Sequence, residues 1–249
     1  VAVCEQQGEQ DGGLMAREVV RIVTPGTVVE PGLLADKRNN YLAALVLSPQ
    51  GVGLAHADIT TGEFATTQVV AGSGRSGVEA TAAALRELER LNPAELVLSD
   101  GGDPYLSQGA PGPDELARRY PALAGLGAPV ALFEDWRFEA GNARQALLAH
   151  FSVSTLAGYG CEDQPLAARA AGVLLQYLQA HQPAALKQLS GLSTYSVEAH
   201  MALDTPTRRS LEITESMRGG DAEGSLLAIL DKTLTPMGGR LLRRWLGQP

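Results

Sequence analysis

The sequence predicts an α/β protein in which a mixed sheet is followed by an all-α segment. Three β-rich runs follow one another with short connections, at residues 41–47, 52–59 and 62–70. Such short connections favour an antiparallel meander. Helix and strand patterns then alternate as far as Trp136, beyond which the strand signals fade. A meander followed by alternating units is typical of a mixed sheet with helices packed on it.

The first expected element is a strand at residues 19–23, which ends at Thr24-Pro25-Gly26. Proline removes a donor from the ladder, and glycine permits a left-handed turn, so the chain is expected to leave its first structural unit here. Residues 1–27 are therefore interpreted as the end of a preceding domain together with its linker.

An amphipathic helix follows the meander, because apolar residues recur at helical spacing over residues 78–91 and the pattern stops before Pro93. The next run, at residues 95–99, is short and apolar, which suits a buried strand. A further helix at residues 113–120 and a further strand at residues 129–133 continue the alternation. We assign residues 28–160 to this α/β domain.

Beyond Trp136 a helix is predicted at residues 140–151. Residues 161–249 are predicted to form a helical domain, in which a longer helix begins near Pro165. The apolar side chains of the longer helix form one stripe, which predicts one long buried face: they are Leu166, Ala170, Val173, Leu174, Tyr177, Leu178 and His181.

Two later helices are indicated by their N-caps. Ser225 precedes an apolar run, and Thr235 precedes a helix with Pro236 at its first position. Serine and threonine side chains accept hydrogen bonds from the first free amides of a helix, and proline is tolerated at the first position because it has no amide to satisfy.

Composition restricts the function. The 249 residues, 45% hydrophobic and 19% charged, suit two ordinary soluble domains. No apolar run reaches the roughly 18 residues that span a bilayer. Cys4 and Cys161 lie far apart without metal-ligand spacing, which argues against a disulfide framework or a zinc site and favours a reducing cytoplasm. The net charge of -8 argues against a dedicated DNA-binding surface.

One glycine pattern leaves a nucleotide-binding module open as an alternative. The segment Gly72-Ser-Gly-Arg-Ser-Gly77 has the form G-x-G-x-x-G, and Asp100 follows at the spacing of a ribose-binding acid. The strand before it is polar and alternating, however, whereas the first strand of a dinucleotide fold is continuously apolar. This difference favours a simple turn. The phosphate-binding sequence G-x-x-x-x-G-K-S/T is absent from the chain.

Acidic residues near strand ends leave a second alternative. Asp58, Glu63, Asp100, Glu134 and Asp135 could hold two divalent metals for phosphodiester hydrolysis. A metal-dependent nuclease would use Asp58 and Asp100 above all. Acids are also common where strands enter turns, and a fold does not confer chemistry by itself.

Separate signatures along the chain resemble one protein family. They are Leu203-Asp-Thr-Pro-Thr-Arg-Arg-Ser-Leu-Glu-Ile213, Gly224-Ser-Leu-Leu-Ala-Ile-Leu230, Thr235-Pro-Met-Gly-Gly-Arg-Leu-Leu-Arg-Arg-Trp-Leu246, Val1-Ala-Val-Cys-Glu-Gln6, Arg17-Glu-Val-Val-Arg-Ile-Val-Thr-Pro-Gly-Thr27, Ala57-Asp-Ile-Thr-Thr-Gly-Glu-Phe64, Asn92-Pro-Ala-Glu-Leu96 and Ala171-Gly-Val-Leu-Leu-Gln-Tyr177. Taken together, they make the chain similar over essentially its whole length to MutS, the bacterial family that recognises DNA mismatches.

The resemblance implies a piece of a longer protein. Residues 1–27 would be the end of the mismatch-binding domain, residues 28–160 a ribonuclease-H-like connector domain, and residues 161–249 the start of the helical core (lever) domain. Such a segment is expected to be non-catalytic and to transmit signals between mismatch binding and a distant ATPase domain. It would need no cofactor itself, since ATP, ADP and Mg belong to the rest of the parent.

The resemblance also implies partners: other MutS domains, a second MutS subunit, MutL, and duplex DNA, which this piece alone would bind weakly or not at all. Arg144 and Gln145 are the candidate MutL-docking residues, because they point outward from a helix whose Leu147, Leu148 and Phe151 can face the domain. The same pair is equally typical of an ordinary solvated helix face.

Overall fold

The computed structural model describes residues 2–7, 16–29, 34, 37–72, 76–100, 128–201, 203–218 and 222–248. Within these residues the main body is a six-stranded sheet with the order β7-β6-β3-β4-β5-β8. Its strands are β3 (Leu42–Ser48), β4 (Gly51–Asp58), β5 (Glu63–Val70), β6 (Glu95–Ser99), β7 (Val130–Phe133) and β8 (Ser193–Thr194).

The sheet is mixed, which confirms the predicted class. Strands β3, β4 and β5 form the antiparallel meander, while β6 runs parallel to β3 and β7 runs parallel to β6. The short strand β8 adds to the other edge, parallel to β5. Gly51 opens β4 with a φ of 145°, a backbone conformation that side chains disfavour, so the tight turn between β3 and β4 needs glycine here.

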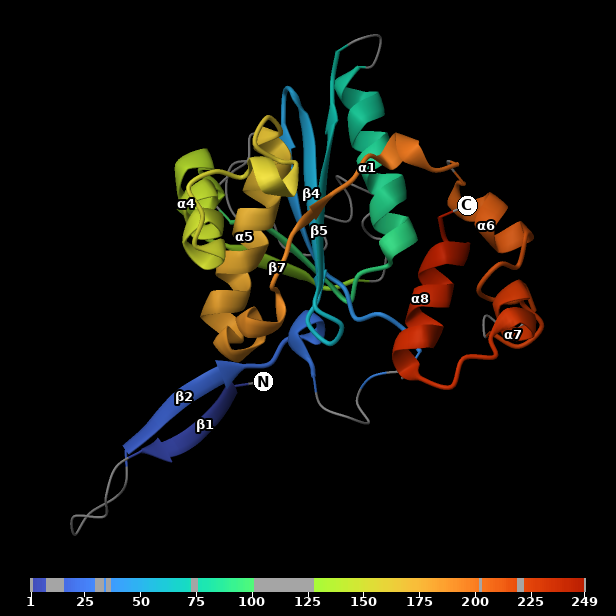
Figure 1. Cartoon of the computed structure of the whole chain (residues 1–249), viewed down its shortest axis with the longest axis horizontal. Helices are drawn as coiled ribbons and strands as arrows, with labels where there is room; N and C mark the ends of the chain where they lie inside the picture. The colour runs from blue at the N-terminus through green and yellow to red at the C-terminus, as the bar shows by residue number, and fades with distance from the viewer. Residues whose placement is uncertain are drawn as a thin grey trace.

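Helices cover both faces of this sheet (Figure 1). Helix α1 (Gly77–Leu91) packs on one face, and α5 (Pro165–His181) packs on the other with α4 (Ala140–Phe151) beside it. Side chains of a strand point alternately to opposite faces. Accordingly, Ala44 and Val46 of β3 join the core under α5, whereas Ala43 and Leu45 join the core under α1.

Helix α5 buries the stripe that the sequence predicts. Leu174 and Tyr177 are almost completely inaccessible to solvent. Burial extends further round the helix than one stripe, because α5 is enclosed by the sheet on one side and by α4 on the other. The contact with α4 is close enough that a Cβ at Gly172 would collide with the backbone of Ala143.

The packing of α5 bears on the domain boundary. The sequence pattern predicts that this helix belongs to a helical domain that begins at residue 161. In the structure α5 contacts β3, β4 and β5, and it supplies much of one core of the α/β unit. We therefore propose that the boundary lies later, between β8 and α6 (Thr205–Ser210).

Two smaller parts flank the α/β unit. At the N-terminus, β1 (Ala2–Gln7) and β2 (Ala16–Ile22) pair antiparallel as a ribbon that extends away from the main sheet (Figure 1). At the other end, α6 is followed by α7 (Leu226–Leu230) and α8 (Pro236–Leu246). Short 3-10 helices complete the described elements: η1 (Pro25–Thr27), η2 (Asp135–Phe138), η3 (Ala157–Tyr159), η4 (Pro183–Gln188) and η5 (Val197–Ala199).

The predicted caps are confirmed. Ser225 accepts a hydrogen bond from the amide of Ala228, and Thr235 accepts one from Gly238. The expected helix at residues 113–120 lies outside the described residues. Of the neighbouring aromatic side chains Trp136 and Phe138, Phe138 is buried, whereas Trp136 is 51% exposed.

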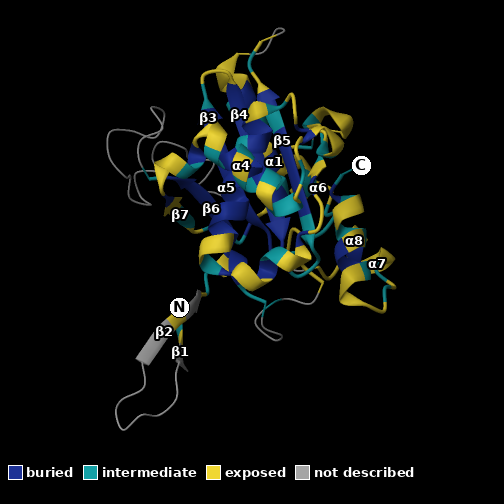
Figure 2. Cartoon of the chain, turned by 60° about the vertical axis from the view of Figure 1, so that its left-hand side comes forward, coloured by how far each residue is buried: buried dark blue, intermediate teal, exposed yellow. Residues whose placement is uncertain are grey.

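Helix α8 carries an exposed apolar stripe. Met237, Leu241 and Trp245 are exposed, whereas Arg240 of the same helix is buried. Exposed apolar residues continue onto α7 with Ile229. Figure 2 shows this contrast, because α7 and α8 are largely exposed while the central strands are buried. The charged face of α8 is therefore the one that meets the α/β unit.

Candidate functional site

One end of the main sheet receives the attachments of both flanking parts. The strand register places Leu42 opposite both Ala57 and Glu95, and it places Asp58 opposite Glu63. Glu95, Leu42, Asp58 and Glu63 therefore mark the same end of four neighbouring strands, which we call the junction end. Figure 1 shows that the N-terminal ribbon and α8 both approach the sheet at this end.

The N-terminal linker is attached through Glu95, which is buried. Its carboxylate accepts hydrogen bonds from the Thr24 hydroxyl at 2.5 Å and from the Gly26 amide at 2.9 Å. The Tyr177 hydroxyl of α5 donates to the other oxygen at 2.8 Å. Burial, followed by the nearby Glu95 charge, raises the pKa of Tyr177 above its usual value, so the phenol stays protonated as the donor.

The helical segment is attached by charged contacts. Arg240 of α8 donates to the hydroxyl of Thr60, and Arg244 donates to Glu63 at 3.1 Å. Two ion pairs add to the attachment. Lys37 pairs with Asp231, which lies between α7 and α8, at 2.8 Å, and Arg38 pairs with Glu215, which lies between α6 and α7.

Glu63 joins α8 to the interior of the sheet. The Tyr41 hydroxyl donates to Glu63 at 3.1 Å, and Nε2 of His56 lies 3.6 Å from its other oxygen. Burial alone would raise the pKa of Glu63, but the contacts with His56, Arg244 and Tyr41 outweigh it and lower the pKa to about 2. The carboxylate is therefore charged at neutral pH and available to bind Arg244.

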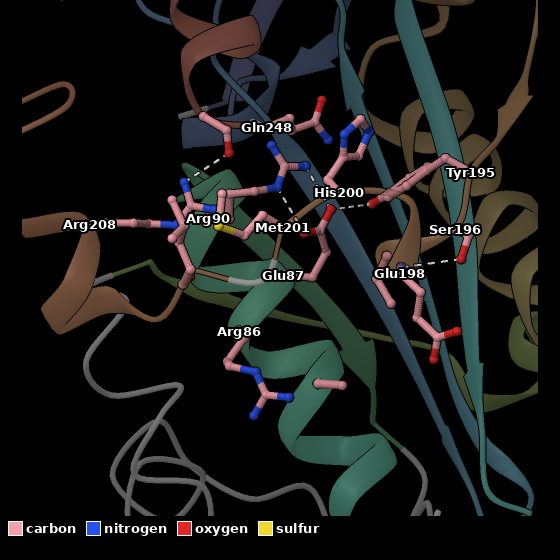
Figure 3. A pocket seen from close by; sticks show the side chains of 14 residues that line it. Arg86, Glu87, Arg90, Tyr195, Ser196, Glu198, His200, Met201, Arg208 and Gln248 are labelled. Atoms are coloured by element: carbon pink, nitrogen blue, oxygen red, sulfur yellow. Dashed lines mark hydrogen bonds and ion pairs between the residues drawn. The ribbon is translucent and has the colours of Figure 1, made fainter. Parts of the chain in front are cut away.

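A pocket of about 270 Å³ lies beside the junction, between α1, the segment that follows β8, and the end of α8 (Figure 3). Arg90 binds Glu87 through two hydrogen bonds of 2.8 and 2.6 Å, and the Tyr195 hydroxyl donates to the same carboxylate at 2.8 Å. Arg208 donates to the carbonyls of Leu203 and Gly247. These bonds join the end of α8 to α6, and they join the segment after β8 to α1.

The residues of the nuclease alternative do not come together. Asp58 lies at the junction end, whereas Asp100 follows the last residue of β6 at the opposite end, roughly 17 Å away at the usual rise of a strand. The carboxylate of Asp58 already accepts hydrogen bonds from protein donors, including the side chain of Asn39 and the backbone amide of Asn40. Among the described residues there is no group of three or more His, Cys, Asp or Glu side chains that could hold a metal.

The remaining acids also have local roles. Asp100 accepts from the amide of Asp135 at 2.9 Å, and Asp135 accepts from Ser99 at 2.6 Å. Glu134 pairs with Arg137. These contacts cap the ends of β6 and β7, as the turn interpretation of the sequence predicts.

The glycine pattern is only partly described, because residues 73–75 lie outside the described residues. The described parts show that Ser76 caps α1 and that β5, the preceding strand, belongs to the antiparallel meander. After α1 the chain continues into β6, which pairs with β3 and not with β5. A dinucleotide site requires a helix that links two neighbouring parallel strands, whereas β3 and β4 lie between β5 and β6. This topology disfavours the nucleotide-binding alternative.

The structure places Arg144 and Gln145 on α4, remote from the junction end. Gln145 is exposed. Arg144 is engaged by Glu162 at 2.5 Å, and Glu162 also accepts from Thr155 and from the amide of Leu156. Leu147 is buried and packs under the helix, as expected.

Sequence reasoning did not identify Glu95, Arg240 or Arg244 as functional. Glu95 could have been noticed because it opens an otherwise apolar buried strand, and a carboxylate in that position needs donors. The arginines of α8 could have been noticed because Arg240 and Arg244 are four residues apart and therefore lie on one side of the helix.

Fold and junction together define a class of protein segment in which a mixed α/β unit joins a ribbon and a helical part at one end of its sheet. Comparison with known families specifies the class. The model of MutS domain II matches residues 40–190, and the model of MutS domain III matches residues 206–249. The chain belongs to the MutS family, which is a DNA mismatch-repair family.

Relatives named DNA mismatch repair protein MutS match the whole chain. The protein of Dehalococcoides mccartyi strain 195 is 44% identical over 251 residues, and that of Symbiobacterium thermophilum is 42% identical over 253 residues. The protein of Thermosynechococcus vestitus is 45% identical over 255 residues. Each match covers 100% of this chain but only 26% to 28% of the relative. The chain thus spans about a quarter of the length of these relatives.

Within the described part of the chain, no helix combines the length and the apolar character needed to cross a membrane.

Proposed function

We propose that this chain is a non-catalytic segment that transmits conformational signals within a DNA mismatch-repair protein. The observation that supports this function is the shared junction end. The linker from the N-terminal ribbon binds Glu95, and α8 binds Thr60 and Glu63, at neighbouring strand ends of one sheet. A displacement of either part therefore acts on the same few strand ends.

The spacing of the attachments favours coupling. Glu95 and Glu63 lie on β6 and β5, which are separated by β3 and β4 in the sheet order. Three strand spacings correspond to roughly 15 Å. The intervening strands are buried between two cores, and close-packed interiors transmit strain instead of absorbing it. Polar attachments at such a rigid edge can rearrange without disrupting either core.

The transmission proposal is tested in a full-length MutS that contains this segment. Arg244→Met removes the ion pair to Glu63 without altering the mismatch-binding domain. Mismatch affinity should stay within about twofold of the unaltered protein, while the stimulation of ADP-to-ATP exchange by a mismatch should fall at least about fivefold, equivalent to roughly 1 kcal/mol of coupling.

The control for this experiment is Arg137→Met, which breaks another arginine ion pair, with Glu134, away from the junction end. It should leave the stimulation of exchange unchanged. Full stimulation in the Arg244→Met protein, with its fold intact, would show that this attachment does not carry the signal.

We further propose that the exposed side of α4 docks MutL. Gln145 is exposed and offers amide donors and an acceptor, and Arg144 lies beside it with a side chain that is 40% exposed. Exposed polar residues on a rigid helix suit a polar and transient interface. The pairing of Arg144 with Glu162 holds the guanidinium in place, so less side-chain freedom is lost on binding.

The docking test introduces Arg144→Glu with Gln145→Glu into the full-length protein. ATP-dependent recruitment of MutL to mismatched DNA should fall at least about tenfold, equivalent to roughly 1.4 kcal/mol, while mismatch affinity is retained. Arg144→Glu also places a second carboxylate next to Glu162, which can disturb the local structure. The single variant Gln145→Glu is therefore measured as well. The matched control is Gln179→Glu on the exposed side of α5. If the double variant recruits MutL normally, α4 presents only an ordinary solvated face.

The proposed setting follows the same family. Other MutS domains and a second MutS subunit would surround this segment, and duplex DNA would be bound by the longer protein. ATP or ADP with Mg would bind in a distant domain. We propose a bacterial cytoplasmic protein that associates with DNA.

A further inference from the structure

We propose that Asp58 is the coupling residue of the junction end: its buried carboxylate links the N-terminal linker to α8 through one continuous set of hydrogen bonds. The inference rests on the proposed transmitting function and names the residue through which transmission runs. Asp58 thereby has a positioning role in place of the metal-binding role that its sequence context left open.

The first half of the connection runs to the N-terminal linker through Asn40. The backbone amide of Asn40 donates to Oδ2 of Asp58 at 3.3 Å. The side-chain amide of the same residue donates to the carbonyl of Pro25 at 3.0 Å. Pro25 opens η1, the short helix whose Gly26 amide binds Glu95. A shift of the linker therefore moves Asn40, and with it the backbone amide that donates to Asp58.

The second half runs to α8 through Thr60. The Thr60 hydroxyl donates to Oδ1 of Asp58 at 2.5 Å, and its backbone amide donates to the same oxygen at 2.9 Å. The hydroxyl oxygen accepts a hydrogen bond from Arg240 of α8. A hydroxyl that accepts from a cation becomes a stronger donor, so the bond to Asp58 is strengthened when α8 is in place.

Burial of Asp58 prevents water from replacing the hydrogen bonds of this connection. Asp58 is 0% exposed, so water cannot replace a donor that moves away. A buried carboxylate oxygen that loses its donor is left unsatisfied, which is unfavourable. The two oxygens of one carboxylate are rigidly joined, and each accepts from a residue that contacts a different flanking part: Asn40 contacts the linker, and Thr60 contacts α8. Movement on one side is therefore unfavourable unless the other side follows.

The experiment uses the chain itself and measures amide hydrogen exchange after a change on one side of Asp58. Asn40→Ala removes the bond to Pro25, and it should speed exchange of the α8 amides about tenfold. Arg240→Met removes the bond to Thr60, and it should speed exchange of the Gly26 and Thr27 amides by a similar factor, because coupling between two sites is reciprocal. Amides of α5 should be unaffected in both variants.

Two further variants test whether the effect passes through Asp58. Asp58→Asn should reduce both cross-effects to less than about twofold. Since that variant removes a buried charge and can disturb folding, Thr60→Val removes only the hydroxyl and should abolish the same cross-effects, while Thr60→Ser should restore them. Arg137→Met is the matched control, because it breaks an ion pair with Glu134 away from the junction end and should leave the exchange of the Gly26 and α8 amides unchanged.

Unchanged α8 exchange in Asn40→Ala would overturn the proposal, as would cross-effects that survive Thr60→Val at full size. Either result concerns only the route through Asp58. Failure of the broader function would instead appear as normal mismatch-stimulated nucleotide exchange in the full-length Arg244→Met protein.

Discussion

A single buried carboxylate determines where the N-terminal linker meets the α/β unit. Glu95 is only 3% exposed, and its donors are Thr24, Gly26 and Tyr177. Loss of the carboxylate would leave several polar groups without a partner at once, and each buried unsatisfied group costs about 1 to 3 kcal/mol. Glu95 therefore contributes to the hold on the linker in a way that no apolar contact can replace.

The core under α5 makes a residue-scale prediction. Leu174 is completely buried between the sheet and its neighbours, so Leu174→Ala should lower the free energy of unfolding by about 2 to 5 kcal/mol. The measurement is urea-induced unfolding. Gln179→Ala on the exposed side of the same helix is the control and should change stability by less than about 0.5 kcal/mol. An equally small change for Leu174→Ala would contradict the packing described for α5.

The buried acids of the junction end were beyond the reach of sequence patterns. An acid in an alternating strand has the same signature whether it faces water or a buried arginine. The partners of Glu95 lie 69 and 82 residues away in the chain, and Arg244 lies 181 residues from Glu63. Only the folded topology brings such residues together. Caps such as Ser225, in contrast, act within one helical turn and were predictable.

At the scale of elements, α8 is turned so that its charged side meets the α/β unit. Arg240 and Arg244 bind the sheet end, whereas Met237, Leu241 and Trp245 are exposed. Surface helices of globular proteins normally bury the apolar stripe instead. An exposed apolar stripe of this kind marks a surface suited to further packing.

Elements were predicted more reliably than their arrangement. The meander, α1, β6, β7, α4 and α5 all lie close to their expected positions. The domain to which α5 belongs cannot be predicted in the same way, because periodicity shows which side of a helix is buried and not what covers it. The burial of β4 on both sides by α1 and α5 could not be read from its sequence for the same reason.

At the scale of the whole molecule, the charge distribution predicts weak DNA binding. The net charge is -8, and arginines of α8 are already engaged by Thr60 and Glu63. Phosphate contacts need free lysine and arginine side chains. This chain should bind duplex DNA with a dissociation constant between about 1 µM and 0.1 mM, and without preference for a mismatch.

Fluorescence anisotropy with matched and mismatched duplexes checks this expectation at a stated salt concentration. A full-length MutS serves as the positive control for mismatch discrimination. Discrimination by this chain alone would mean that residues outside the mismatch-binding domain read the base pair.

The ionic character of the α8 attachment has a consequence for its dependence on solution conditions. The pairs Lys37–Asp231, Arg38–Glu215 and Arg244–Glu63 each leave one side chain at least 40% exposed. Dissolved ions screen charges over about 8 Å at physiological ionic strength, whereas apolar cores are insensitive to such screening. Added salt therefore weakens the ion pairs that attach the helical segment, while the stability of the α/β unit is unchanged. The ionic strength of the surroundings thus controls how freely the helical segment moves relative to the α/β unit.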